Sequence, residues 1–358
     1  MARRFLVPAR ARAGGVLVAL AICRPPAFGA ESVAVDPVAA DPAAADPAAA
    51  DPATSAPAPD PRRACESIPD DRERLACFDG KPAVARSVPP RPSLYDDVWE
   101  LEPRNQRGAF LLRPHLPNYL LPARYTTRVS DRPATPSPGH RVDAPLPIDA
   151  TEAKYQFSVK LKAWQNVFGD NGNLWLAYTQ TSNWQVYNTD ASRAFRETNY
   201  QPEAILSFRT DVDVLGWRWR LLNLGFVHES NGRSLPLSRS WNRVYAQFGL
   251  ELGRWALQLR PWWRLPEDGV DDDNPDIEDY LGKGDLRLSH IREGHVYSLL
   301  GRYSFAGHRG YVGLEWAFPI SGPLKGYLQV TSGYGETLID YNHSQTTVGV
   351  GLLLVPWQ

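Results

Sequence analysis

The sequence lacks both a large net charge and a long apolar run, two features that would each indicate a class of protein directly. Its formal net charge at pH 7 is only -1, which gives no electrostatic reason to expect a nucleic-acid partner. Beyond a short apolar run near the N-terminus, no stretch approaches the roughly 20 apolar residues of a transmembrane helix. Membrane residence could therefore come only from a β-barrel, in which neighbouring strands satisfy each other's backbone groups.

The mean hydropathy is low, whereas aromatic residues are plentiful. A mean hydropathy of -0.38 is usual for a soluble protein, but barrel strands alternate apolar and polar residues, so an average hides them. The 12 Trp and 15 Tyr suit a membrane-interface belt, although ordinary cores and carbohydrate-binding proteins also use aromatic side chains. Composition alone leaves both classes open.

The N-terminus has the pattern of an export signal, which we place at residues 1–30. Several arginines precede a short apolar core at residues 15–22, and small residues around Ala27 offer a cleavage site. Lipid attachment at Cys23 is an alternative, but the bulky Ile22 stands where a small residue is usual.

Three segments separate this signal from the rest of the chain. Residues 31–61 repeat Asp, Pro and Ala, and we expect a disordered linker because proline blocks both helix and sheet. Residues 62–80 hold Cys65 and Cys77, the only cysteines after the signal. In an oxidising periplasm a disulfide is the simplest fate of such a pair, and two free thiols are the alternative. Residues 81–108 are rich in Pro and Arg and are predicted to form a second linker.

Residues 109–358 have the pattern of strands joined in hairpins. Segments of about ten residues alternate apolar and polar side chains and are separated by Gly, Asn, Asp and Pro. Between Leu174 and Val186 the even-numbered residues are mostly apolar and the odd-numbered ones mostly polar, and residues 348–354 repeat the alternation. This indicates an all-β fold, a transmembrane antiparallel barrel with an apolar exterior. A soluble sandwich would show the same alternation.

The residues that suggest chemistry lie where two predicted strands meet. Residues two apart in a strand share a face, so His228 and Ser230 point the same way. If residues 231–241 connect the strands, Asn242 lies directly across from His228. All three side chains then lie on the outside of the barrel at its loop end, where polar groups are costly unless they serve a function.

This trio suits acyl transfer. Ser230 would attack an ester, His228 would accept its proton, and Asn242 would orient the imidazole. An asparagine brings no negative charge, so further help is required, and a metal ion can supply it. The alternative is that His and Ser merely close a polar loop rim.

An acidic run at residues 271–276 is the second candidate feature. It follows a predicted strand at residues 255–264, which places it at the same end of the barrel as the loop after Ser230. There it would be within reach of a hard cation. A solvated surface loop is the alternative, and the usual fate of such runs.

At these residues the chain resembles the outer membrane phospholipase A family. The resemblance is carried by residues 228–234 (HESNGRS) and 238–243 (SRSWNR), with shorter matches at 178–180, 196–200, 272–277 and 332–336. It covers about Pro114 to the C-terminus, with the motifs in order and similarly spaced. The family implies a barrel of roughly twelve strands in the Gram-negative outer membrane, with the first strand near residues 118–128.

The resemblance also implies the roles given above to the trio, together with a calcium ion. The ion would be held by the Ser238 hydroxyl and the Arg233 backbone carbonyl, with Asp273 acting through water. Leu235 departs from the pattern, because it stands where an Asp would serve a second calcium site in the monomer, and the sequence does not support that site.

The implied substrates are phospholipids and lysophospholipids, and the implied active form is a calcium-dependent homodimer. Gln180 would lie at its interface, because it falls on the outward face, where an unpaired amide is costly and could pair with its own copy. Two competing functions are a non-enzymatic barrel, such as a porin, and a soluble β-rich esterase or lectin.

Overall fold

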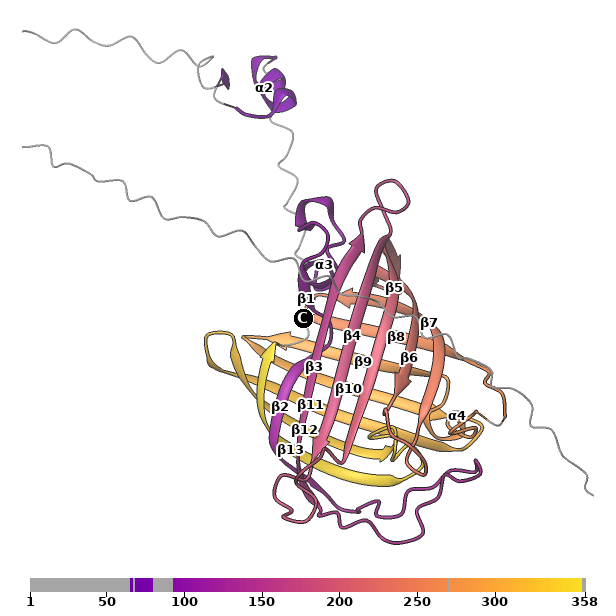
Figure 1. Ribbon diagram of the computed structural model, residues 1–358. Coiled ribbons are helices and arrows are strands. Elements are labelled where there is room, and N and C mark those ends of the chain that lie inside the picture. Colours follow the sequence, from indigo (N-terminus) through magenta and orange to yellow (C-terminus); the bar gives the residue numbers. More distant parts are fainter. Residues whose placement is uncertain (1–64, 67, 80–92, 270, 356–358) are drawn as a thin grey trace, which may run out of the picture. The chain divides into compact units, whose positions relative to one another are not determined.

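The computed structural model describes residues 65–66, 68–79, 93–269 and 271–355 (Figure 1). The predicted export signal and the first linker, residues 1–61, lie outside this range. The chain divides into two units with the boundary after Ala85, and each is described by itself. No helix in the described residues is both long and apolar enough to cross a membrane.

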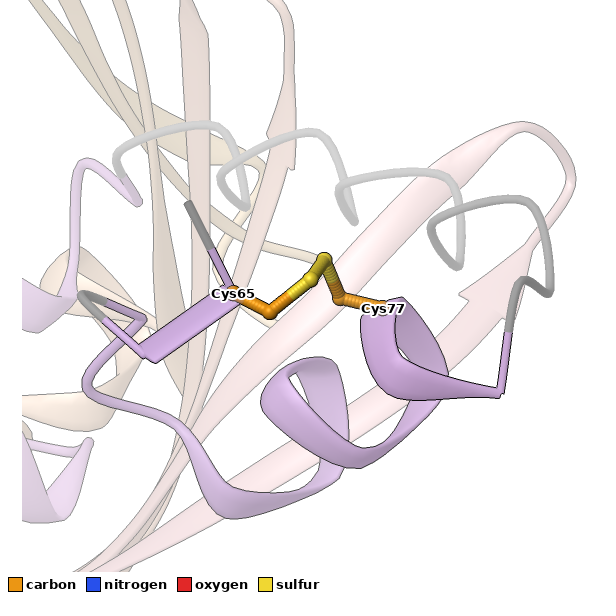
Figure 2. The surroundings of a disulfide bond; sticks show 2 residues. All are labelled: Cys65 and Cys77. Atoms are coloured by element: carbon orange, nitrogen blue, oxygen red, sulfur yellow. A yellow bond between two sulfur atoms is a disulfide. The ribbon is translucent and has the colours of Figure 1, made fainter. Parts of the chain in front are cut away.

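The first unit contains one short helix and a disulfide. Helix α2, Asp71–Phe78, begins after Asp70, whose side chain accepts hydrogen bonds from two backbone amides of the first turn. This is a standard way to satisfy the free N–H groups of a helix start. Figure 2 shows the disulfide between Cys65 and Cys77, with their Cα atoms 5.7 Å apart.

The second unit is a closed antiparallel barrel of twelve strands, as predicted (Figure 1). The strands are β2 (Asn118–Thr126), β3 (Thr151–Trp164), β4 (Asn173–Trp184), β5 (Glu197–Val214), β6 (Trp217–Ser230), β7 (Ser240–Leu252), β8 (Trp255–Leu265), β9 (Gly284–Arg292), β10 (His295–Ser304), β11 (Arg309–Ser321), β12 (Leu324–Tyr334) and β13 (Ser344–Val355). Each pairs with the next, β13 pairs with β2, and a short strand β1 (Leu112–Pro114) also pairs with β3. No strand edge of the barrel is left open to lipid.

The two faces of the barrel wall differ as a lipid environment requires. Large apolar side chains are exposed on the outside, among them Leu176, Leu224, Phe226, Val244, Leu314 and Val350. The inside holds the buried ion pairs Arg124–Glu152 (2.6 Å) and Lys154–Glu336 (2.8 Å) and the half-buried pair Arg287–Glu315 (2.7 Å). A soluble β-sandwich buries its apolar face instead, so this arrangement excludes the soluble alternative.

The two ends of the barrel are built differently. At one end the turns between β5 and β6, β7 and β8, β9 and β10, and β11 and β12 are two residues long. At the other end long loops follow β2, β4, β6, β8 and β12. Outer-membrane barrels have short periplasmic turns and longer external loops, so the loop end faces outward from the cell.

Residues 93–108 pack into the barrel interior, so this part of the expected linker at 81–108 is not a linker, and residues 81–92 lie outside the described range. From Ser93 onward this segment contains helix α3 (Asp96–Trp99) and a 3-10 turn, η1 (Pro103–Asn105). Its apolar residues Tyr95, Trp99 and Leu101 are buried against inward-facing strand residues, namely Trp175, Ala177, Ile205, Leu221 and Ala256. We call residues 93–108 the plug. Its Pro- and Arg-rich composition concealed these few apolar anchors.

Glu100 holds the plug to the barrel wall. Its buried carboxylate pairs with Arg113 (2.7 Å) and Lys162 (2.8 Å) and accepts a hydrogen bond from the Arg107 backbone amide (3.0 Å). Burial by itself raises the pKa of Glu100, but the Lys162 and Arg113 contacts and the Arg107 amide outweigh burial and hold that pKa below its usual value. The plug therefore supplies the charge that balances an otherwise buried lysine.

Replacing Glu100 by Gln should destabilise the plug by about 3 kcal/mol or more, because Lys162 would be left buried without a counter-charge. Urea unfolding in detergent, followed by tryptophan fluorescence, would report the loss. Because the pKa of Glu100 is lowered in the folded protein, Glu100 stabilises the fold at neutral pH. This stabilisation is lost as the pH falls through the lowered pKa. Asp97→Asn, which removes an exposed carboxylate from helix α3, directly before Glu100, is the control. Equal unfolding midpoints for the two variants would contradict this role.

Candidate active site

His228 and Asn242 form the centre of the site on the outer wall. They are direct partners across β6 and β7, in the register predicted from the sequence. The His228 Nδ1 lies 2.9 Å from the Asn242 Oδ1. Both are half-buried, and each is two residues from an exposed apolar neighbour, Phe226 or Val244, so they point toward lipid.

This contact fixes the protonation of the imidazole. An amide oxygen can only accept, so Nδ1 of His228 carries the proton and Nε2 keeps a free lone pair. A general base requires that lone pair. Ser230 is two residues after His228 in β6, so it lies on the same face, and it is paired with Ser240 of β7. In the described part of the chain the Ser230 hydroxyl has no hydrogen bond to His228, and such contacts often tighten only with substrate.

Asn231, directly after Ser230, shapes the loop between β6 and β7. Its buried Oδ1 accepts hydrogen bonds from the backbone amides of Arg233 (3.2 Å) and Arg239 (3.0 Å). Its Nδ2 donates to the Leu237 carbonyl at 2.8 Å. One side chain thus closes the loop that carries Ser238. The sequence offered Asn231 only as part of a motif, without this role.

The acidic run of the β8–β9 loop comes to this same loop, as expected from its position after β8. The Ser238 Oγ donates to Asp273 Oδ2 at 2.7 Å, and Ser240 donates to the same oxygen at 3.3 Å. The other carboxylate oxygen contacts His140 Nε2 at 2.8 Å. His140 lies in the distant β2–β3 loop, and no local signal in the sequence pointed to it.

The chemistry of these donors suits a hard cation. Ser238 and Asp273 offer a hydroxyl and a carboxylate close together, and calcium prefers oxygen ligands. Among the described residues, however, no three His, Cys, Asp or Glu side chains gather to hold a metal. A cation here would take its other ligands from backbone carbonyls, water or a second copy of the chain.

Gln180 lies on the outer wall, as predicted, but its amide is not unpaired. Its Nε2 donates to Tyr155 Oη and Ser182 Oγ, both at 3.2 Å, and its Oε1 accepts from Tyr178 Oη at 3.1 Å. The expectation of a costly free amide is therefore wrong. Neighbouring hydroxyls on β3 and β4, which the alternation pattern could not locate, satisfy it.

Comparison with known proteins gives consistent relatives. A family model described as Phospholipase A1 matches residues 95–354, so the match includes most of the plug. The Phospholipase A1 of Klebsiella pneumoniae is 39% identical over 278 residues, which is 77% of this chain and 93% of that protein.

Two solved structures have a similar fold. The calcium-bound dimer of the outer membrane phospholipase of Salmonella typhi has a TM-score of 0.64 and 37% identity, covering 71% of this chain and 96% of that one. An active-site Asn-to-Ala mutant of outer membrane phospholipase A from Escherichia coli has a TM-score of 0.64 and 36% identity, covering 74% and 98%.

Proposed function

This chain belongs to the phospholipase A1 family, and on that premise we propose that it hydrolyses acyl esters of phospholipids and lysophospholipids with Ser230, His228 and Asn242. It is an outer-membrane β-barrel protein. The observation that carries the proposal is the His228–Asn242 hydrogen bond on the lipid-facing wall. A polar pair in that place is costly, and substrate lipids reach it directly from the membrane.

The proposed reaction follows the usual order of acyl transfer. Ser230 Oγ attacks the ester carbonyl while Nε2 of His228 accepts the hydroxyl proton. The imidazolium then returns the proton to the leaving alcohol, and an acyl-enzyme remains. Water, activated by the same His228, releases the fatty acid and regenerates Ser230. Asn242 keeps the imidazole in its working tautomer throughout.

We propose calcium as the cofactor, held by the Ser238 hydroxyl and the Arg233 backbone carbonyl, with Asp273 acting through water. Support comes from the hydroxyl–carboxylate contact and from the Salmonella typhi relative, whose dimer holds calcium. When bound, the ion supplies positive charge for the oxyanion. The backbone N–H of Ser230 is the proposed second donor to that oxygen.

A homodimer through the outer wall of β3 and β4 is also proposed. This wall exposes the large apolar side chains Phe157 and Leu176 beside Gln180. The Gln180 amide already has hydrogen-bond partners within one copy of the chain. Across an interface its oxygen would therefore accept one additional hydrogen bond.

The non-enzymatic alternative fits the structure less well. A porin needs a water-filled lumen, whereas the plug here buries Tyr95, Trp99 and Leu101 against the inner wall. The lumen beyond it is crossed by buried ion pairs such as Lys154–Glu336.

Ser230→Ala should abolish phospholipid hydrolysis, a loss on the order of 10⁶-fold, without affecting folding, because Ser230 contributes chemistry and little packing. Asn242→Ala should lower the rate of hydrolysis by about 100-fold, because His228 remains as the base but is no longer held in the right orientation. Fatty-acid release from mixed micelles would measure both, with heat-modifiable gel migration as the folding control. A greater loss in Asn242→Ala than in Ser230→Ala would contradict the assigned roles.

Ser238→Ala should raise the calcium concentration for half-maximal activity by about tenfold, because one of few protein ligands is removed. Chelation should abolish the activity of the parent protein, and added calcium should restore it. Ser234→Ala makes the same chemical change at an exposed position of the same loop and should leave the calcium dependence unaltered. Activity that survives chelation would exclude calcium as the cofactor.

Gln180→Ala should weaken the calcium-dependent dimer by about 1 kcal/mol or less, as for other membrane-buried hydrogen bonds. Activity per enzyme should then fall at low protein density in detergent and recover at high density. Dimer fraction and hydrolysis would be measured together over a range of enzyme-to-detergent ratios, with Ser332→Ala on β12 as the control. A variant that dimerises like the parent would place Gln180 outside the interface.

A further inference from the structure

A carboxylate lies behind the proposed triad. We infer that Glu267 is a positioning residue that acts on His228 through Asn242, and that it supplies the negative charge which an asparagine cannot bring. The Asn242 Nδ2 donates to Glu267 Oε1 at 2.8 Å, while the Asn242 Oδ1 faces His228 Nδ1 at 2.9 Å. The inference rests on the proposed function, because it needs His228 to be the base.

The local structure explains why Glu267 reaches this place. Asn242 is paired across the sheet with Leu265, the last residue of β8. Pro266 follows, lacks a backbone N–H and cannot continue the ladder, so the strand ends there. Trp263 and Leu265 are exposed on the outer wall, and Glu267 is the next residue in that alternation. It therefore comes to the same face as Asn242.

The first consequence concerns the orientation of the amide. A terminal amide can rotate by half a turn and exchange its oxygen and nitrogen. In the reversed orientation Nδ2 of Asn242 would donate to the imidazole, Nδ1 of His228 would have to be unprotonated, and Nε2 would carry the proton. Such an imidazole could not accept the Ser230 proton. A carboxylate only accepts, so Glu267 selects the orientation in which Oδ1 faces His228.

The second consequence is electrostatic. The imidazolium that forms during the reaction is stabilised by a nearby negative charge, which a neutral amide does not carry. Glu267 places a carboxylate one residue further back, linked by two hydrogen bonds. Partial burial is the main cause that raises the pKa of Glu267, and Asp272 and Asp273 add to it. The Asn242 hydrogen bond and the nearby Arg264 act the other way and favour the charged carboxylate.

Glu267→Gln tests the charge while keeping an oxygen that Asn242 can donate to. We expect kcat for phospholipid hydrolysis to fall about 5- to 10-fold with little change in KM, the difference between a charged and a neutral hydrogen bond. The acidic limb of the kcat–pH profile should move to lower pH, because the imidazolium loses a stabilising charge. Asp268→Asn, which removes an exposed carboxylate from the next position, should change neither.

Combining Glu267→Gln with Asn242→Ala separates this role from a merely structural one. If Glu267 acts through Asn242, Glu267→Gln should cause no further loss of activity in a protein that already carries Asn242→Ala. Equal losses in both backgrounds, or a kcat and pH profile like the parent's, would overturn the inference. Heat-modifiable migration checks that each variant folds. The proposed function fails separately, if Ser230→Ala keeps parental hydrolysis.

Discussion

The constraint on which the structure depends is that no backbone polar group can be left unpaired in lipid. Pairing of β3 with β4 closes the ring of strands and satisfies it. Closure also fixes which side chains face lipid, because alternate residues of every strand must point outward. The outer wall is therefore largely apolar, and polar groups on it such as His228, Asn242 and Gln180 stand out as candidates for a role other than folding.

The same closure fixes the geometry of the site. A slip of one residue between β6 and β7 would send His228 into the lumen and separate it from Asn242. Residues of the inner face oppose such a slip. Glu229, which lies between His228 and Ser230 in the chain, pairs inside the barrel with Arg243 (2.7 Å) and Trp241 (2.9 Å). Those partners flank Asn242, so the inner contacts hold the outer residues in register.

How much could be read from the sequence follows from the range of the interactions. The period of two and the 228–242 pairing are local, and the sequence predicted both the outer wall and its register. The plug was missed because Tyr95 and Trp99 are isolated anchors in a Pro-rich stretch, and their partners on the barrel strands of the same buried cluster are more than 70 residues away along the chain. The partners of Gln180 were missed because alternation gives a face but not which hydroxyls border it.

The loops carry the residues that sequence reasoning could least locate. His140 contacts Asp273, and Glu267 contacts Asn242, across loops whose paths no periodic pattern specifies. Yet these loops emerge from a wall in which every strand is paired on both sides, so their polar residues meet at one end of a small set of strands. The barrel thus supplies a fixed pair, His228 and Asn242, and the loops determine which charged groups surround it. Relatives with the same wall could therefore differ in the support behind the asparagine without any change in the reaction.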